Sequence, residues 1–399
     1  MIIQPKIRGF ICTTAHPEGC TKYVMQWIEY VKKQSCLNEG PKKVLVIGAS
    51  TGFGLGSRIV AAFGMGAKTV GVFFEKPANG KRTASAGWYN AAAFEKVARD
   101  EELYAKSING DAFSEEIKQK TIDLIQNDWQ GDVDLVIYSI ASPRRIHPKS
   151  GEVFNSVLKP IGQQYRNKTV NVMTGKVSEI FIEPANEKEI KDTEAVMGGE
   201  DWILWIDALL KNNCLAKGIK AVTFTYIGPE LTHAIYRNGT IGRAKLHLEK
   251  AVKELDIQLK LKLDGRALIS VNKALVTHAS TAIPVVPLYI SLLYKIMKTK
   301  NIHEGCIEQM WRLFSQYLYN NHEIPTDVEG RIRIDDLEMR YDVQQEVERL
   351  WHSIGNDNIE TISDIAGYRR EFYQLFGFDL DNVNYKKEVD IDINIPSIN

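Results

Sequence analysis

The sequence contains few cysteines and no long uninterrupted apolar run. Its five cysteines among 399 residues are odd in number and irregularly spaced, which argues against a disulfide framework and is typical of a reducing compartment. The longest apolar stretch, AIPVVPLYISLLYKIM at residues 282–297, is interrupted by two prolines and is too short to span a bilayer. The opening segment MIIQPKIRGF lacks the basic-then-apolar pattern of a signal peptide. We therefore expect a cytoplasmic protein with free thiols at Cys12, Cys20, Cys36, Cys214 and Cys306.

The sequence also lacks an excess of either charge. Fifty lysines and arginines balance fifty acidic residues, and no basic block stands out, so a nucleic-acid partner or an acidic membrane surface has no electrostatic support. None of the eight histidines stands in an H-E-x-x-H motif or at paired Cys/His spacing, and we therefore predict no metal site. The composition, 44% hydrophobic and 25% charged, is that of an ordinary globular protein.

From residue 43 onward, short apolar runs alternate with helical patterns. The runs KVLVIG, KTVGVFFE, YAKSING and VDLVIYSIAS are each followed by a longer segment, and IKAVTFTYIG and GRALISVNKALVTH resume the pattern further on. Strands that are apolar throughout and separated by helices indicate a parallel sheet that is covered on both faces. Right-handed crossovers then predict an α/β fold with a doubly wound, Rossmann-type, mostly parallel sheet.

No repeat or low-complexity linker divides the chain, so we expect one elaborated Rossmann-type domain over residues 1–399. Residues 1–42 form an N-terminal addition with a hairpin-like start and one helix. Residues 43–300 form the cofactor- and substrate-binding core, with an insertion at about 150–215 that includes a β-excursion. Residues 301–399 form an extension of polar helices and a small β part, which we expect in the acidic tail FGFDLDNVNYKKEVDIDINI.

The turn after the first core strand, GASTGFGLGSR at residues 48–58, fits two incompatible descriptions. As a G-x-S-x-G motif it is the elbow that presents the nucleophilic serine of a hydrolase, here Ser50. As a glycine-rich turn between a strand and a helix it cradles the pyrophosphate of a dinucleotide. A third alternative is an ordinary βαβ turn that binds no ligand.

Three features favour the dinucleotide. Gly54 and Gly56 follow Gly52 at alternate positions, where a pyrophosphate needs bare backbone at the start of a helix. The turn follows the first core strand, whereas the hydrolase elbow normally follows several. Glu75 lies nineteen residues after Gly56, about where an acid binds the adenosine ribose of NAD and repels the 2′-phosphate of NADP. Ser50 is then a residue of the cofactor loop.

The ends of the later strands extend this predicted cofactor site, because ligands of open α/β sheets lie beyond the carboxyl ends of the strands. We expect Asp111 and Ala112 at the adenine edge, although the aspartate of NGDAF is also an ordinary turn residue. Residues 139–141 are expected at the nicotinamide ribose. The cofactor-binding residues predicted up to this point are Gly48, Ala49, Ser50, Thr51, Gly52, Phe53, Gly54, Phe74, Glu75, Asp111, Ala112, Ser139, Ile140 and Ala141.

A dehydrogenase of the short-chain type needs a tyrosine hydroxyl for the substrate oxygen and a lysine for the nicotinamide ribose. The usual Y-x-x-x-K spacing occurs only at Tyr294 and Lys298, on an apolar helix far from the fourth strand, and we interpret it as a chance match. The segment after the fifth strand, TYIGPELTHAIYRNGTIGRAKLHLEK, offers Tyr226, Tyr236 and Lys245 instead.

Tyr236 and Lys245 are nine residues apart. On an unbroken helix this spacing corresponds to about 900° of rotation, which would put the two side chains on opposite faces. Tyr236 must therefore lie before the helix, with residues 238–240 (Asn-Gly-Thr) as the turn and cap that lead to Lys245.

With this Y-x8-K spacing the chain resembles the trans-2-enoyl-CoA reductases, also called FabV-type enoyl-ACP reductases, which are enlarged members of the short-chain dehydrogenase superfamily. The resemblance extends nearly end to end, with no departure at a functional position. It is carried by the segments GFICTTAHPEGC, GASTGFGLGSR, GVFFEKP, SAGWYN, NGDAF, YSIASPRR, MGGEDW, TYIGPE, YRNGTIGRAK and THASTAIPVVPLYISLLYK.

The resemblance implies NADH-dependent reduction of an enoyl thioester, such as crotonyl-CoA to butyryl-CoA, in fatty acid metabolism. Hydride would pass to the β-carbon, and the enolate oxygen that forms would need a hydrogen-bond donor. In the family's terms Tyr236 is this donor and proton source, and Tyr226 is a second hydroxyl on the substrate carbonyl. Lys245 binds the cofactor ribose and favours the phenolate of Tyr236.

The resemblance also places the backbone of Ala274, Leu275 and Val276 against the nicotinamide carboxamide. Thr277 and Ile283 would contact the substrate, and the following STAIPVVPLYISLL segment would wall an apolar acyl tunnel.

Several alternatives remain open at this level. An enoyl-ACP reductase on the same scaffold, a 3-ketoacyl thioester reductase and a nucleotide-sensing module that has lost its chemistry all fit the fold. The scarcity of basic patches favours CoA over an acidic carrier protein, and we expect a monomer. Arg144 and Arg145 are assigned either to phosphate binding or to a solvated loop, and Trp88 and Tyr89 to packing.

Overall fold

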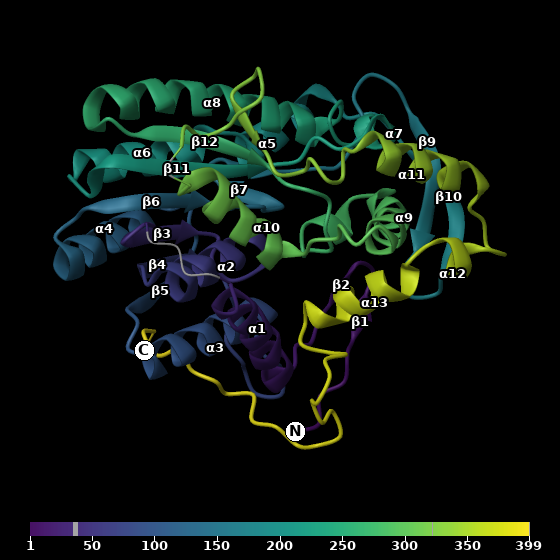
Figure 1. Cartoon of the computed structure of the whole chain (residues 1–399), viewed down its shortest axis with the longest axis horizontal. Coiled ribbons are helices and arrows are strands. Elements are labelled where there is room, and N and C mark those ends of the chain that lie inside the picture. Colours follow the sequence, from purple (N-terminus) through teal and green to yellow (C-terminus); the bar gives the residue numbers. More distant parts are fainter. Residues whose placement is uncertain (35–38, 321, 399) are drawn as a thin grey trace.

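Seven parallel strands form the centre of the molecule (Figure 1). The computed structural model describes residues 1–34, 39–320 and 322–398. The strand order is β13-β12-β11-β6-β3-β4-β5, and every neighbouring pair is parallel. The strands are β3 (Lys43–Ile47), β4 (Lys68–Phe73), β5 (Ala105–Asn109), β6 (Val133–Tyr138), β11 (Leu215–Thr225), β12 (Arg266–Val271) and β13 (Arg331–Arg333). From β3 the chain adds β4 and β5 on one side of the sheet, and then β6, β11, β12 and β13 on the other side. The order of the strands therefore reverses between β3 and β6.

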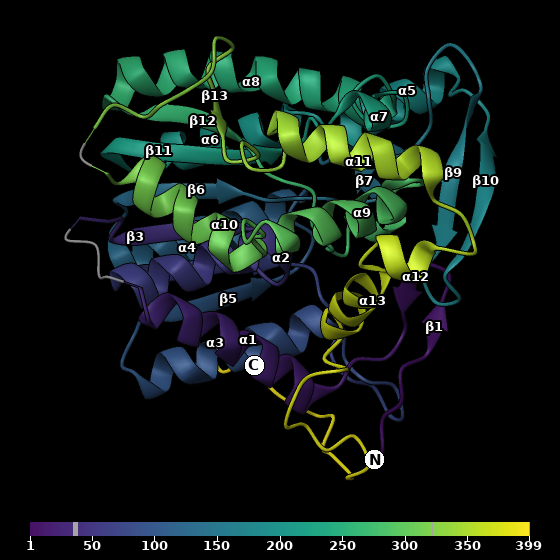
Figure 2. The ribbon, with the colours of Figure 1, turned by 45° about the vertical axis from the view of Figure 1, so that its right-hand side comes forward.

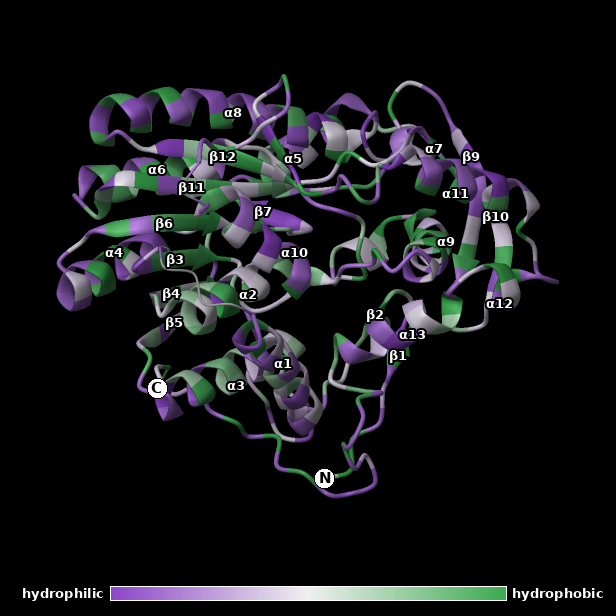
Figure 3. Ribbon diagram, in the orientation of Figure 1, coloured by the Kyte–Doolittle hydropathy of each residue, from purple (hydrophilic) through white to green (hydrophobic). Residues whose placement is uncertain are grey.

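Helices cover both faces of this sheet. Alternate residues of β3 point to opposite sides: Val44 and Val46 join a core with α1, α2 and α3, whereas Leu45 and Ile47 join a core with α4, α6 and α8. These helices are α1 (Pro17–Lys32), α2 (Gly52–Ile59), α3 (Ala86–Asp100), α4 (Glu115–Trp129), α6 (Glu200–Lys211) and α8 (Thr240–Leu263). Figure 3 shows β3 and β6 as predominantly hydrophobic, as strands buried on both faces must be. The predicted fold class is confirmed.

Most of the remaining elements gather beyond one end of the sheet, where Figure 2 shows α9, α11 and α13 beside the hairpin β9–β10, whereas α10 packs on α2. The antiparallel hairpins are β1–β2 (Ile7–Arg8, Ile11–Cys12), β7–β8 (Arg144–Ile146, Val153–Asn155) and β9–β10 (Tyr165–Asn171, Lys176–Ile182). The helices are α5 (Glu187–Met197), α7 (Glu230–His233), α9 (Val286–Thr299), α10 (Cys306–Arg312), α11 (Tyr341–Ser353), α12 (Ile359–Ile362) and α13 (Ile365–Gln374), with single π or 3-10 turns at Val60–Gly64, Ser280–Ala282 and Leu313–Leu318.

Helix α6 lies within the segment that the sequence assigned to an insertion, but it belongs to the sheet. Trp202 and Trp205 are fully buried in the core that α6 shares with α4 and α8. This helix is therefore the crossover that connects β6 to β11, and the insertion ends before it.

The prediction of β-structure in the acidic tail is wrong, since the described residues 375–398 contain no strand. Val389 and Ile391 are buried and their neighbours exposed, which is the period-2 pattern of a strand. No second strand among the described residues pairs with this backbone: Tyr89 Oη donates to the Ile391 carbonyl (2.9 Å) and Trp88 Nε1 to that of Ile393 (2.7 Å). Only Met1 of these residues pairs with it through main-chain atoms, exchanging two hydrogen bonds with Val389 (2.7 and 3.0 Å). Trp88 and Tyr89 thus anchor the tail.

Strand β13 was not predicted, because its sequence RIR is short and mostly polar. Only Ile332 is buried, and the strand adds to the edge of the sheet by pairing with β12. The small β part of the C-terminal extension is therefore part of the main sheet.

The described cysteines Cys12, Cys20, Cys214 and Cys306 are buried and free, and Cys36 lies outside the described residues. Among the helices that the structure describes, none is both long enough and apolar enough to cross a bilayer.

A buried ion pair joins α4 to α6 beneath the edge of the sheet. Lys118 Nζ donates to Asp201 Oδ1 (2.8 Å) and also to the carbonyls of Ala112 and Phe113. Tyr138 Oη donates to the second oxygen of Asp201 (3.0 Å). Both charged side chains are almost completely buried, so removing one of them leaves the other without compensation.

We expect Lys118→Met to lower the free energy of unfolding by about 3–5 kcal/mol, because it leaves the Asp201 carboxylate buried without a cation. The measurement is urea unfolding followed by tryptophan fluorescence. Lys260→Met is the matched control, because its partner Asp264 is exposed and such pairs contribute at most about 1 kcal/mol. Equal unfolding midpoints for the two variants would contradict this assignment.

Candidate active site

The predicted site residues lie at the carboxyl ends of six neighbouring strands. The glycine turn follows β3, and Phe74 and Glu75 follow β4. Asp111 follows β5 and residues 139–141 follow β6, while Tyr226 follows β11 and residues 274–276 follow β12. Because all of these strands are parallel, the fold brings these segments to the same edge.

The glycine turn is held by close backbone contacts. Gly48 has a φ of +91°, and a Cβ there would lie 2.1 Å from the Ser139 carbonyl oxygen. A Cβ on Gly54 would lie 1.9 Å from the carbonyl oxygen of Gly48. Gly52, with a φ of +54°, begins α2, and the preceding Thr51 makes no side-chain cap. The turn thus leaves bare amides at a helix N-terminus, as a pyrophosphate requires.

Glu75 lies beside this turn. Its Oε1 accepts a hydrogen bond from Ser50 Oγ (2.7 Å), and its backbone exchanges two hydrogen bonds with the Asn109 side chain. A Cβ on Gly87 would lie 2.0 Å from Glu75 Oε1, so α3 can approach only because residue 87 is glycine. Burial raises the pKa of Glu75. The roles of Asn109 and Gly87 were not predicted: both lie in segments that carry the resemblance, NGDAF and SAGWYN, but nothing in these segments indicates a contact with Glu75.

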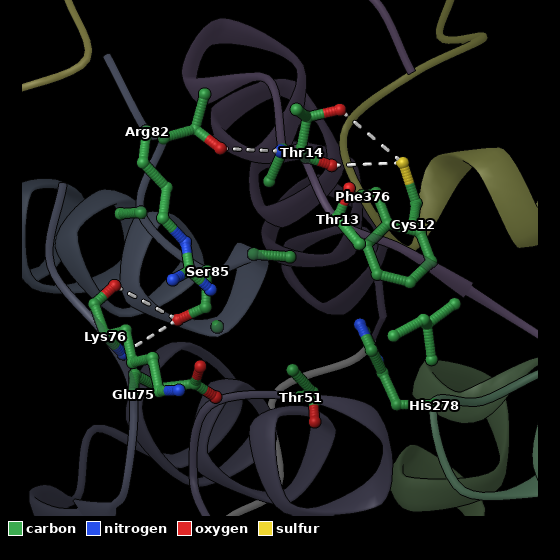
Figure 4. Close-up of a pocket in the computed structure, with 16 residues that line it drawn as sticks. Cys12, Thr13, Thr14, Thr51, Glu75, Lys76, Arg82, Ser85, His278 and Phe376 are labelled. Carbon is green, nitrogen blue, oxygen red and sulfur yellow. Dashed lines mark hydrogen bonds between the residues drawn. The ribbon is translucent and has the colours of Figure 1, made fainter. Parts of the chain in front are cut away.

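A cavity of about 310 Å³ opens beside Glu75 and Thr51 (Figure 4). The loop after β2, the segment 82–87, His278 and Phe376 complete its lining. Burial lowers the pKa of His278 to about 4, and its Nδ1 is buried without a hydrogen-bond partner among the described residues. The bare amides of the turn, the Glu75 carboxyl and this unpaired nitrogen all fit a dinucleotide.

At the ends of the other strands, some of the predicted cofactor-binding groups already form hydrogen bonds within the protein. Asp111 Oδ1 accepts from the Phe113 amide (3.0 Å), as an ordinary turn aspartate does. The Ala112 carbonyl accepts from Lys118 and from Trp205 Nε1, so it is not free for an adenine. Their contact with a cofactor, like that of residues 139–141, stays a prediction.

Two tyrosines stand together after β11. The rings of Tyr226 and Tyr236 are 5.0 Å apart between centroids and meet edge to face at 76°. Helix α8 begins at Thr240, with Gly239 as its N-cap, and the Gly242 amide donates to the Tyr236 carbonyl (3.0 Å). Tyr236 therefore lies before the helix, as the spacing predicted.

Lys245 occupies the second turn of α8 and is buried like Tyr236. Its Nζ donates to the Phe224 carbonyl (3.2 Å), and burial lowers its pKa to about 8. Burial raises the pKa of Tyr236. In this arrangement the desolvated hydroxyl therefore keeps its proton, and the expectation that Lys245 favours the phenolate of Tyr236 stays a prediction. A protonated phenol is what a hydrogen-bond donor requires.

The C-terminal extension reaches this site through Glu338, which lies between β13 and α11. Tyr226 Oη donates to its Oε1 (2.9 Å), and the Ala274 amide donates to its Oε2 (2.7 Å). The Val276 amide donates to Tyr294 Oη (3.1 Å). The tyrosine of the chance Y-x-x-x-K match therefore binds the backbone of the segment 274–276. Sequence reasoning missed Glu338, because it stands in the polar segment DDLEMR, where an acid is expected to face solvent.

Thr277 and Ile283 follow this backbone. A Cβ on Gly52 would lie 4.0 Å from Thr277 Cγ2, so Thr277 stands over the glycine turn. Ile283 is partly buried against the hydrophobic core, just before α9. The acyl tunnel along this segment stays a prediction.

Arg144 and Arg145 have different roles. Arg145 is buried, and its guanidinium donates to Glu200 and to the Ala195 carbonyl, both at 2.6 Å. Arg144 is exposed. Arg145 therefore holds α5 and α6 together and is not available to a phosphate. No cluster of His, Cys, Asp or Glu side chains that could hold a metal ion occurs in the part of the chain that the structure describes.

Three family models match the chain. The one described as trans-2-enoyl-CoA reductase catalytic region covers residues 82–319, and the NAD(P)H binding domain of trans-2-enoyl-CoA reductase covers residues 2–80. The third, described as an enoyl reductase FAD binding domain, covers residues 326–389.

Curated relatives match over the whole length. An enoyl-[acyl-carrier-protein] reductase [NADH] from Coxiella burnetii (strain CbuG_Q212) is 75% identical to this chain, and the match covers 100% of this chain and 98% of the relative. A trans-2-enoyl-CoA reductase [NADH] from Ruminiclostridium cellulolyticum is 58% identical, with both chains covered in full.

Solved structures agree with these matches. A Clostridium trans-2-enoyl-CoA reductase in complex with NADH superposes with a TM-score of 0.96 at 44% identity and full coverage of both chains. A Treponema denticola trans-2-enoyl-CoA reductase in complex with NAD has a TM-score of 0.92 at 47% identity, with 98% of each chain covered.

The residues of the segment 326–389 do not fit a flavin. The buried faces of α11 and α13, including Val343, Val347 and Phe372, pack into the protein core. Its carboxyl groups on the buried Glu338 and the partly buried Glu371 accept hydrogen bonds from other parts of the chain and would repel a diphosphate. Only Phe376 of this segment lines the cavity beside Glu75.

The predicted resemblance and the expected nicotinamide cofactor agree with the family matches and with the bound cofactors of the solved relatives. The matches cover nearly the whole chain. This chain belongs to the trans-2-enoyl-CoA reductase family of NADH-dependent enoyl-thioester reductases.

Proposed function

We propose that the chain reduces trans-2-enoyl-CoA thioesters, such as crotonyl-CoA, to the saturated acyl-CoA with NADH. The observation that carries this proposal is the pair of tyrosines after β11, Tyr236 buried and Tyr226 partly buried, with the glycine cradle at the same sheet edge. A hydroxyl placed there can donate to an oxygen that becomes negative during the reaction. A simple dinucleotide sensor would not need this pair.

Bound NADH supplies the hydride, which adds to the β-carbon of the enoyl group. The electron pair of the double bond then moves onto the thioester oxygen, which becomes an enolate. Tyr236 keeps its proton because burial raises its pKa, and its hydroxyl donates to this oxygen. As the electron pair on the oxygen re-forms the thioester carbonyl, the α-carbon takes up one proton, which Tyr236 supplies and regains from water. The β-carbon thus gains a hydride and the α-carbon a proton.

The cofactor would be held by residues from several strand ends. The amides of residues 50–54 would bind the pyrophosphate, since those of Gly48 and Ala49 already donate to the Val72 carbonyl. Glu75 would bind the adenosine ribose, and Lys245 the nicotinamide ribose. The backbone of residues 274–276, whose Ala274 and Val276 amides donate to Glu338 and Tyr294, would face the carboxamide. Tyr226 would bind the thioester carbonyl as a second hydroxyl, and Thr277 and Ile283 would contact the acyl thioester.

A second candidate substrate is an enoyl-ACP, which the names of the Coxiella relative and of a Flavobacterium johnsoniae relative favour. The exposed side chains of Lys76 and Arg82 line the cavity beside Glu75 and could attract either the phosphates of CoA or an acidic carrier protein. Comparing kcat/KM for the same enoyl group on CoA and on the carrier decides between the two. We propose a monomer in both cases.

We expect addition of crotonyl-CoA to consume NADH, and Tyr236→Phe to lower kcat by about 10²–10³, the usual effect of removing one oxyanion donor. The measurement is the loss of NADH absorbance. Folding should be unaffected, because the Tyr236 hydroxyl bonds to no other described residue.

Tyr104→Phe is the control for the loss of one phenol, since Tyr104 Oη binds Asp128 outside the candidate site. It should turn over like the unmodified enzyme. Full turnover by Tyr236→Phe, with an unchanged melting temperature, would contradict the role of Tyr236.

We expect Glu75→Ala to narrow the preference for NADH over NADPH by about tenfold or more, which corresponds to about 1.4 kcal/mol of lost discrimination. The carboxylate would repel a 2′-phosphate, and its removal leaves Lys76 and Arg82 at the same cavity. The measurement is the ratio of kcat/KM values for the two cofactors.

Glu116→Ala removes an exposed carboxylate from the first turn of α4, outside the cavity lining. This variant should keep the original ratio. A ratio that is also unchanged in Glu75→Ala would disprove the ribose assignment.

A further inference from the structure

Glu338 is a completely buried carboxyl group that the C-terminal extension contributes to the substrate end of the site. Its Oε1 accepts from two tyrosines, Tyr226 (2.9 Å) on the end of β11 and Tyr289 (2.6 Å) on α9. Its Oε2 accepts from the Ala274 amide (2.7 Å). One side chain thus binds both the second substrate tyrosine and the backbone that is expected to face the nicotinamide.

This arrangement determines what the Tyr226 hydroxyl can do. A tyrosine hydroxyl carries one proton and can therefore donate one hydrogen bond at a time. While Glu338 is ionised it can only accept, so Tyr226 donates to it and has no proton left for a substrate carbonyl. When Glu338 carries a proton on Oε1, that proton is donated to a tyrosine oxygen, and Tyr226 is free to donate to the substrate. Oε2 accepts from Ala274 in both states.

The surroundings of Glu338 favour the protonated form. Burial raises its pKa, and Asp335 on the same turn acts in the same direction, although Asp335 is itself paired with Arg333 (2.7 Å). The facing cation is Lys273 after β12, which opposes this shift. Lys273 Nζ donates to the backbone carbonyls of Ala274 and Glu304, both at 3.2 Å.

The other groups that face Glu338 are not charged. Tyr226 and Tyr289 bind its Oε1, and the ring of Tyr236 packs on that of Tyr226. From α11, Gln344 Nε2 donates to Tyr289 Oη (3.1 Å) and to the Glu338 carbonyl (2.6 Å). These contacts fix the position of the carboxyl group from every element packed against it.

We propose that Glu338 is a positioning residue for the reduction: it holds Tyr226 and the Ala274 backbone together, and its proton decides whether Tyr226 donates to the substrate carbonyl. This inference rests on the proposed function, in which Tyr226 binds that carbonyl. It also gives the segment 326–389 a role that needs no flavin, because the extension then supplies the residue that aligns the site.

The test compares the pH dependence of kcat for the full-length enzyme with those of Glu338→Gln and Glu338→Ala, using crotonyl-CoA and NADH. The glutamine amide reproduces the neutral carboxyl: its oxygen can accept from Ala274, and its NH₂ can donate to the tyrosine oxygens. The unmodified enzyme should lose activity as the pH rises through the pKa of Glu338, since Tyr226 then donates to the carboxylate.

In Glu338→Gln the fall in kcat at high pH should move to higher pH, and kcat at low pH should stay within about threefold of the unmodified value. In Glu338→Ala kcat should fall by roughly 10- to 100-fold at every pH, because the donor is no longer held in place. Melting temperature and NADH binding show whether each variant is folded, and the glutamine variant carries the test if the alanine variant is not.

Glu95→Gln is the matched control. Glu95 is also buried, but on α3, where it accepts from Ser397 and lies 3.9 Å from Arg58 Nη2. If this variant is folded, it should keep the original pH profile. An unshifted profile in Glu338→Gln would overturn the protonation role, and a folded Glu338→Ala with normal kcat would overturn the positioning role.

Tyr226→Phe separates this inference from the proposed function. If it keeps full kcat, the role of Tyr226 in the proposed function fails. If it lowers kcat while Glu338→Gln keeps the original profile, only the inference about Glu338 fails.

Discussion

The close approach of the β3 and β6 backbones at Gly48 and Ser139 is the constraint on which the rest of the site depends. A single Cβ at residue 48 would collide with the Ser139 carbonyl, and one at residue 54 would collide with the carbonyl of Gly48. The strand order reverses at this point, and the loops on either side diverge to leave the crevice in which such sheets bind ligands. The glycines therefore place the crevice and also leave its amides bare.

The proposed catalytic residues Tyr236 and Lys245 follow β11, and their spacing does not put them on one face of a helix. The chain ends the strand, makes a short turn that contains Tyr236, and starts α8 only at Thr240. Gly242 is required for this turn, because a Cβ there would lie 1.9 Å from the Arg237 carbonyl oxygen. The C-terminal extension then holds the second tyrosine, Tyr226, through Glu338, so the end of β11, the turn before α8 and the extension meet around the two tyrosines.

Much of this arrangement could be predicted, because it depends on patterns of residues that are close together in the sequence. Apolar runs identified six of the seven sheet strands, and the rotation of an α-helix showed that Tyr236 lies before α8. Glu338 could not be predicted, because its contact with Tyr226 joins residues 112 positions apart and nothing local distinguishes it from a surface acid. The tail was misassigned because alternating burial does not reveal whether side chains or a strand bind the backbone. Helix α6 was misassigned because its apolar face identifies a covered helix but not the sheet that it covers.

The central claim is that the site directs hydride to the β-carbon of an enoyl thioester and a proton to the α-carbon. Turnover of crotonyl-CoA with NADH deuterated in the transferred position at nicotinamide C4, followed by NMR of the butyryl product, tests it directly. The account predicts deuterium at the β-carbon and a solvent proton at the α-carbon. Deuterium on the carbonyl carbon, or its absence from the product, would contradict it.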